Sequence, residues 1–135
     1  MRVSADPYEY RERITAACIA HLVHLTHVEG TERGKALAAL KVGQLNFSCN
    51  DCHDKSANKW IRGQWLAQQR GQIDHFPTWR TSLLATWDIR KRFQWCQVNI
   101  RADELPPDAK EYGDLELYLT AASLGLPLNV PGIRH

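Results

Sequence analysis

The five residues Cys49-Asn50-Asp51-Cys52-His53 decide how the rest of the chain is interpreted. The pattern C-x-x-C-H is the attachment signature of a c-type haem, in which two thioether bonds tether the porphyrin and the adjacent histidine binds iron. In a chain of this composition the pattern would arise by chance about once in two hundred sequences. The motif therefore predicts one haem c, bound covalently through Cys49 and Cys52, with His53 as an axial ligand of the iron.

Two other interpretations of these residues stay open at this point. Cys49, Cys52, His53 and Cys96 could form a Cys₃His zinc site, because a C-x-x-C knuckle is also common in structural zinc sites. Cys49 and Cys52 could instead be a thioredoxin-like redox pair, but such a pair belongs to a βαβ unit, for which the sequence shows no pattern. The motif is complete only for haem, so the sequence favours a cytochrome.

The composition describes a globular protein of one domain or slightly more. The chain has 135 residues, of which 44% are hydrophobic and 24% are charged. Its 17 Lys and Arg against 15 Asp and Glu give a net charge of +2, too small to predict nucleic acid or an anionic membrane as partner. No apolar run approaches the ~20 residues that a membrane span requires. We therefore expect a protein without a membrane span and without a nucleic-acid partner.

Apolar residues recur at helical spacing in several segments, and no segment shows a convincing strand pattern. The expected helices occupy residues 6–30, residues 31–42, a stretch that begins at Pro77 and Thr78, and a last stretch around residues 112–122. Residues 44–77 are polar, and a loop of this length in a compact domain is unusual unless it is functional. We expect an all-α, loop-rich, cytochrome c-like domain wrapped around a covalently attached haem.

Residues 1–30 are expected to belong to a different domain from the rest of the chain. Residues 21–30 and 117–125 are both leucine-rich helical segments that end in glycine, as cytochrome c domains commonly do. We interpret residues 1–30 as a helix at the end of a missing preceding domain, and residues 31–135 as the haem domain. Gly30 is expected to end the first helix, and Thr31 to begin the second.

The second axial ligand of the iron has several candidates in the sequence. The usual methionine is absent, since the sole Met is Met1 at the terminus. The candidates are the other five histidines and one cysteine, namely His21, His24, His27, His75, His135 and Cys96. Cys96 stands out, because Ile89, Phe93 and Cys96 share one helical face and should turn inward.

Arg92 lies one helical turn before Cys96, where a basic side chain would help to keep the thiol ionised. A thiolate ligand would stabilise ferric iron and lower the reduction potential. The alternative is that Cys96 is a small buried side chain and that Arg92 pairs with Asp88. Arg62, Arg80 and Arg101 could bind the haem propionates, and Arg62 is favoured because it follows the motif most closely.

A series of motifs, in order along most of the chain, closely resembles the C-terminal haem domain of the SoxA family. These motifs are VGQLNFSCNDCHD over residues 42–54, Ile61–Gln64, Phe76–Pro77, Arg92–Cys96, Ile100–Ala102 and Leu115–Leu119. Members of this family are the larger subunit of the periplasmic SoxAX cytochrome of bacterial thiosulfate oxidation. Together the motifs are far more specific than C-x-x-C-H alone, which indicates only a cytochrome.

The resemblance implies an activity and a role for individual residues. His53 would be the proximal ligand, Cys96 the distal thiolate, often a persulfide in the family, and Arg92 the active-site arginine that holds the anionic sulfur substrate. The implied enzyme is an L-cysteine S-thiosulfotransferase, which joins thiosulfate to a cysteine of the SoxYZ carrier while electrons pass to the SoxX cytochrome. The implied location is the periplasm. The competing hypotheses are a plain electron-transfer c-type cytochrome and a zinc-stabilised binding module.

The chain also departs from the family. Its members carry an earlier domain, of which residues 1–30 alone could be a part here, and the sequence shows no export signal. We therefore expect a processed or truncated chain, or a standalone relative without its leader.

Overall fold

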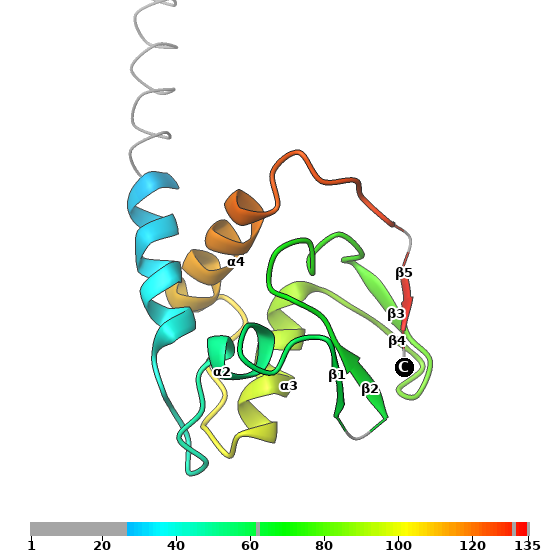
Figure 1. Cartoon of the computed structure of the whole chain (residues 1–135), viewed down its shortest axis with the longest axis horizontal. Helices are drawn as coiled ribbons and strands as arrows, with labels where there is room; N and C mark the ends of the chain where they lie inside the picture. Colours follow the sequence, from blue (N-terminus) through cyan, green and yellow to red (C-terminus); the bar gives the residue numbers. More distant parts are fainter. Residues whose placement is uncertain (1–26, 62, 131, 135) are drawn as a thin grey trace, which may run out of the picture.

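The computed structural model describes residues 27–61, 63–130 and 132–134. Within them the chain forms a helix over residues 27–39 and then both helices and short strands (Figure 1). These are α2 (Cys49–His53), β1 (Lys59–Ile61), β2 (Gln64–Leu66), β3 (Thr78–Arg80), β4 (Ala85–Trp87), α3 (Ile89–Asn99), α4 (Lys110–Ala122) and β5 (Gly132–Arg134). The expected all-α class is therefore wrong, and the fold is mixed.

The strands form two small sheets. Strands β1 and β2 make an antiparallel hairpin in which Trp60 lies opposite Trp65. In the other sheet, β3 is central, with β4 antiparallel on one side and β5 parallel on the other. Each strand has three residues, too few to display the alternation of apolar and polar residues by which a strand is recognised. The pairing of β3 with β5 brings Thr78 opposite Gly132, and no local sequence pattern predicts a pairing between such distant residues.

The segment that follows Pro77 is the clearest local correction. A helix was expected to begin there, but the Phe76–Pro77 peptide bond is cis and β3 begins at the next residue. Helix α3 starts only at Ile89, because the Asp88 side chain caps it by accepting a hydrogen bond from the Lys91 amide at 2.7 Å. The expected last helix is confirmed as α4.

Gly30 does not end a helix, because residues 27–39 form one continuous helix through it. Figure 1 shows this helix beside α4. A Cβ atom on Gly34 would lie 2.0 Å from the Asp114 carbonyl oxygen, and one on Gly30 would lie 2.7 Å from Leu117. The two glycines thus serve close packing of two helices. Thr31 lies within this helix and does not begin a second one. Its hydroxyl donates to the His27 carbonyl oxygen one turn earlier, at 2.8 Å.

Helix α3 is held from two sides. Tyr112 of α4, only 1% exposed, donates to Gln97 and lies with its ring 5.8 Å from that of Phe93. From the other side, Trp87 of β4 makes an edge-to-face contact with Trp95 at 5.8 Å. These contacts determine where the residues of α3, including Cys96, lie.

No helix in the described part of the chain is both long and apolar enough to cross a lipid bilayer. Residues 1–26, which contain most of the expected first segment, lie outside the described residues, so its division from residues 31–135 stays a prediction.

Candidate functional site

The C-x-x-C-H motif forms the one-turn helix α2, and residues 48–54, here named the motif turn, are held mainly by their own side chains. The Ser48 hydroxyl accepts a hydrogen bond from the Asp51 amide, while the Asp51 carboxylate accepts from the Ser48 amide at 3.0 Å. This reciprocal arrangement is a capping box. Lys55 adds an ion pair to Asp51 at 2.7 Å. The residues between the two cysteines therefore shape the turn that places the thiols.

His53 is oriented by a main-chain carbonyl. Its Nδ1 lies 2.9 Å from the Ala67 carbonyl oxygen, which can only accept, so Nδ1 carries the proton and donates. Burial lowers the pKa of His53, the bond to Ala67 opposes this change, and Arg92 lowers the pKa further. The imidazole is therefore neutral at pH 7 and its Nε2 lone pair is left to bind a metal.

Gln69 ties the loop after β2 to the motif turn. Its side-chain amide donates to the Asn50 side chain and, at 3.1 Å, to the Asp54 carboxylate. Gln69 is only 6% exposed, so these bonds are made within the fold. Sequence reasoning missed both Asp51 and Gln69. The S-x-x-D spacing of Ser48 and Asp51 would have revealed the capping box, whereas nothing in the sequence marks Gln69.

The structure brings Cys96 close to the two motif cysteines. All three are free thiols. Although Cys49 as a residue is exposed, burial of its thiol, followed by the neighbouring Cys96 and Cys52, raises its pKa to about 11. Burial and then Cys96 also raise the pKa of Cys52. The sulfur atoms of α2 and α3 thus share one site, as the prediction for Cys96 requires.

The zinc interpretation finds no geometric support in the described part of the chain. Among those residues, no three or more His, Cys, Asp or Glu side chains are gathered so that they could hold a metal ion by themselves. Cys49, Cys52, His53 and Cys96 are neighbours without forming such a cage.

Cys96 is surrounded by positive charge. Burial raises the pKa of its thiol, while Arg92 and then Arg80 act in the opposite direction by favouring the thiolate. The expected alternative for Arg92, an ion pair with Asp88, is not formed: the Asp88 carboxylate instead caps α3. Among the described residues, the Nη1 atom of Arg92 is buried without a hydrogen-bond partner. Cys96, Arg92 and Arg80 are named the Cys96 cluster below.

The remaining sequence candidates are placed elsewhere or lie outside the described residues. His75 pairs with Asp74, with Nδ1 at 2.8 Å from the carboxylate, and its ring packs on Phe76. His27 is an exposed residue of the helix over 27–39, and Arg101 is exposed after α3. The residues outside the description are Arg62, His21, His24 and His135. The propionate role of Arg62 therefore stays a prediction.

The residues at this site fit a c-type haem by the chemistry of their donors. The motif supplies two thiols one turn apart and a neutral imidazole whose Nδ1 is already used. A third sulfur, Cys96, lies near both thiols. Such a set suits covalent attachment together with one nitrogen and one sulfur ligand.

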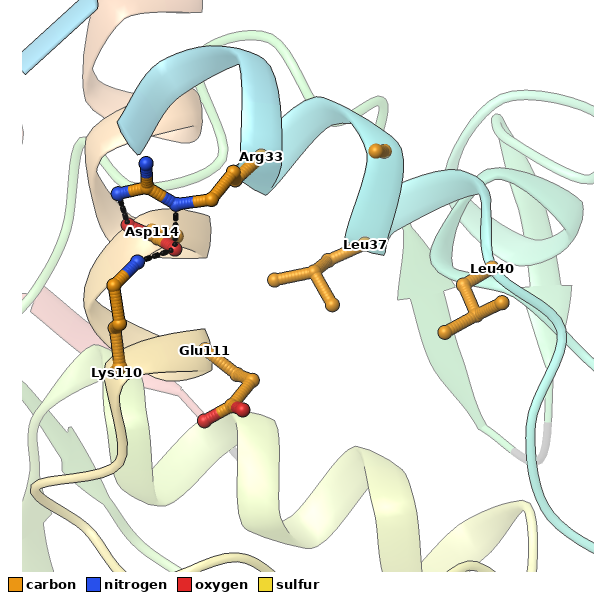
Figure 2. Close-up of a pocket in the computed structure, with 7 residues that line it drawn as sticks. Arg33, Leu37, Leu40, Lys110, Glu111 and Asp114 are labelled. Carbon is orange, nitrogen blue, oxygen red and sulfur yellow. Dashed lines mark hydrogen bonds and ion pairs between the residues drawn. The ribbon is translucent and has the colours of Figure 1, made fainter. Parts of the chain in front are cut away.

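A separate pocket lies between the helix over 27–39 and α4. It has a volume of about 390 Å³ and is lined by Arg33, Ala36, Leu37, Leu40, Lys110, Glu111 and Asp114. Figure 2 shows the Asp114 carboxylate between Arg33 and Lys110, with Leu37 and Leu40 farther along the wall. Asp114 is fully paired there, at 2.7 Å from Arg33 Nε and 2.7 Å from Lys110 Nζ. The pocket contains none of the predicted site residues.

Comparison with known proteins identifies relatives in one family of curated sequences. No family model matches the chain. The L-cysteine S-thiosulfotransferase subunit SoxA of Chlorobaculum thiosulfatiphilum is 35% identical over 102 residues, which are 76% of this chain and 36% of that protein. The subunit of the same name from Pseudaminobacter salicylatoxidans is 37% identical over 104 residues, 77% of this chain and 36% of that protein.

A solved structure agrees with these relatives. A chain of the crystal structure of SoxXA from P. pantotrophus matches with a TM-score of 0.73 and 33% identity, covering 79% of this chain and 40% of that chain. The resemblance to SoxA that the motifs predicted is confirmed. The chain spans little more than a third of the length of the curated relatives it matches.

Proposed function

We propose that this chain, which is related to the SoxA subunits over 76% of its length, is the haem-thiolate part of an L-cysteine S-thiosulfotransferase of the SoxAX type. One observation carries the proposal beyond the relationship itself. The fold places Cys96 beside the motif thiols and beside an arginine whose buried Nη1 atom has no partner among the described residues. A sulfur, a haem motif and an anion-binding group therefore share one site.

Each residue of the site has a distinct part. Cys49 and Cys52 would form the thioether bonds to one haem c, and Nε2 of His53 would bind the iron. Cys96 of the haem domain (residues 31–135), which is often a persulfide in the family, would supply a sulfur ligand. When bound, the haem supplies the electron-accepting centre of the reaction. Arg92 holds the sulfur substrate and favours the ionised form of Cys96.

The proposed reaction joins thiosulfate to a cysteine thiolate of the SoxYZ carrier. A sulfur–sulfur bond forms between the two anions, and two electrons are released to the SoxX cytochrome. The product carries one negative charge where the reactants carried three, so charge balances with the two electrons lost. The proposal includes the periplasm as the location, because covalent haem attachment and these partners belong to that compartment.

A spectrum and an intact mass measured on the holoprotein test the cofactor. After expression with haem-maturation machinery, we expect a Soret band, a mass increase of one covalently bound haem, and a sulfur ligand to the ferric iron. An extra sulfur atom in the mass would report a persulfide at Cys96. A protein without a Soret band, or one whose second axial ligand is nitrogen, contradicts the proposal.

Substitution of Cys96 separates the enzyme from a plain electron-transfer cytochrome. Cys96→Met keeps a sulfur ligand but removes the thiolate, so haem and electron transfer should persist while transfer of thiosulfate to a SoxYZ cysteine is lost. Val98→Met introduces the same residue at an exposed position of α3 and serves as the matched control, with unchanged activity expected. Sulfur transfer that persists in Cys96→Met would leave only the electron-transfer role.

A further inference from the structure

Arg80 is a buried arginine that the proposed function has not used. It lies in β3 and is only 6% exposed. Its guanidinium lies over the Trp87 ring in a cation–π contact, with the central carbon 5.7 Å from the ring centroid. A cation–π contact does not use the N–H groups of a guanidinium as hydrogen-bond donors, so these still need acceptors when they are buried. In the described part of the chain, however, Arg80 Nε is buried without any such partner.

The position of Arg80 is determined by the same contacts that hold Cys96. Strand β4 pairs with β3, and its Trp87 contacts both the Arg80 guanidinium and the Trp95 ring. Trp95 precedes Cys96 on α3. Arg80 lies close enough to Cys96 to oppose the burial that raises the pKa of this thiol. Burial and then the neighbouring charge of Arg92 lower the pKa of Arg80 itself. Arg80 and Arg92 thus approach the same sulfur from a strand and from a helix.

Arg80 is buried and Arg92 is partly buried, and burial of such groups without a carboxylate is costly. Within the described residues, neither Arg80 nor Arg92 makes an ion pair, and each has a buried nitrogen without a hydrogen-bond partner. An unpaired buried charge destabilises a fold, so such groups are typical of sites that receive a ligand. The ligand that suits them is an anion.

We propose that Arg80 and Arg92 together form a two-guanidinium site beside Cys96 that binds the dianionic sulfur substrate, with Arg80 as its second binding residue. This inference rests on the proposed function. The two arginines carry two positive charges and a Cys96 thiolate carries one negative charge, which leaves the cluster positive before the substrate binds. Thiosulfate, with two negative charges and several acceptor oxygens, is opposite in sign to this cluster and can accept hydrogen bonds from its unpartnered N–H groups.

The contacts favour this ligand over a haem propionate. Arg80 favours the ionised form of Cys96, and Trp87 joins it to Trp95 of α3, the helix that carries Cys96. We therefore assign Arg80 to the Cys96 side of the site. Propionate binding by Arg80 is an outcome that the experiment can identify.

The test measures binding of inorganic thiosulfate to the haem-loaded protein by titration calorimetry, with the haem spectrum recorded for each variant. Arg80→Gln should weaken thiosulfate binding about tenfold or more, since one charged donor to the anion is lost. Arg80→Lys, which keeps the charge but not the fork of N–H groups, should lose less. The matched control is Arg90→Gln on α3, which removes an equal charge from an arginine that pairs with Glu116 at 2.9 Å. Thiosulfate affinity should be unchanged in the control.

The outcomes separate this inference from the proposed function. A haem-loaded Arg80→Gln protein with the affinity of the Arg90→Gln control overturns the role of Arg80 and leaves the proposed function standing. Unchanged affinity with a shifted reduction potential or reduced haem content assigns Arg80 to a propionate and also overturns the inference. Failure of the unaltered chain to load haem contradicts the proposed function itself. Weaker binding with an unchanged Soret band and unchanged thermal unfolding supports the inference.

Discussion

The motif turn and the Cys96 cluster lie side by side but are built in opposite ways. In the motif turn, Ser48 and Asp51 satisfy each other, Lys55 pairs with Asp51, and Gln69 adds two more hydrogen bonds. In the Cys96 cluster, positive groups surround a buried thiol and two guanidinium nitrogens have no partner among the described residues. Ser48 and Asp51 are therefore paired within the fold, although Gln69 Oε1 is buried without a partner in the described part of the chain, whereas in the Cys96 cluster the unpartnered groups are positively charged donors.

The contrast indicates a division of labour. A turn that must hold two thiols and an imidazole in position benefits from satisfied hydrogen bonds, because each adds stability and removes freedom. If the Cys96 cluster binds and releases a charged substrate, as we propose, its donors must stay unoccupied until the substrate arrives. Stability is thus given up where a ligand is to bind. Substitutions in the two regions should therefore have opposite effects on folding and on activity.

Apart from the loss of activity expected for Cys96→Met, the largest effect is expected from Arg92→Met. Removal of the arginine should lower kcat/KM for thiosulfate by about 100-fold, because a charged substrate loses a charged donor. The free energy of unfolding without thiosulfate should stay the same or rise, since an unpaired buried donor is removed. Steady-state kinetics and denaturant unfolding measure the two quantities. A loss of stability above about 1 kcal/mol would show that Arg92 has a structural role.

Asp114 provides the comparison for a buried charge that is fully paired. Hydrogen bonds from Arg33, opposed by burial and aided by Lys110, lower the pKa of Asp114 to about 2. Asp114→Asn should therefore cost about 2 kcal/mol at pH 7. Because the folded pKa is below the unfolded value, this stabilisation is present above about pH 4 and is lost as the pH falls toward 2.

Unfolding of both proteins between pH 7 and pH 3 measures this difference. It should shrink as the solution becomes acidic, and a difference that is independent of pH would contradict the ionic origin. The control is Glu111→Gln, an exposed carboxylate of the same helix, whose cost should stay within about 0.5 kcal/mol.

The smallest effect is expected in the motif turn. Ser48→Ala removes the hydroxyl that accepts from the Asp51 amide and should lower the free energy of unfolding by about 1 kcal/mol. Thiosulfate affinity of the folded protein should be unchanged, because Ser48 is not part of the Cys96 cluster. Ser82→Ala, at an exposed position, is the matched control. A variant as stable as this control would show that Asp51 alone holds the turn.

Within the fold, the long helices were predicted better than the short strands. The helix over Lys110–Ala122 was recognised because it is long enough to repeat its apolar face. Strands of three residues contain no such repeat, and β3 depends on β5 at the far end of the described chain. Gly30 was taken as a helix end because glycine commonly has that role, yet here it allows the helix to approach α4.

The site could be predicted where its residues are neighbours in sequence. Cys49, Cys52 and His53 share one short motif, and Arg92 and Cys96 are one helical turn apart. Arg80 was considered only for a haem propionate, because nothing in its local sequence distinguishes it from other arginines. Its place beside Cys96 depends on the pairing of β3 with β4 and on the contact between Trp87 and Trp95.

The sequence by itself determined which reactive groups the chain carries: the C-x-x-C-H motif, Cys96, and an arginine one helical turn before that cysteine. These are local patterns, and short-range geometry is enough to interpret them. Only the tertiary structure decided that Cys96 lies with the motif thiols and that Arg80 joins it. Such contacts arise when separate elements bury their apolar faces against one another, as Trp87 does against Trp95 and Tyr112 against Phe93, and no local rule specifies that packing.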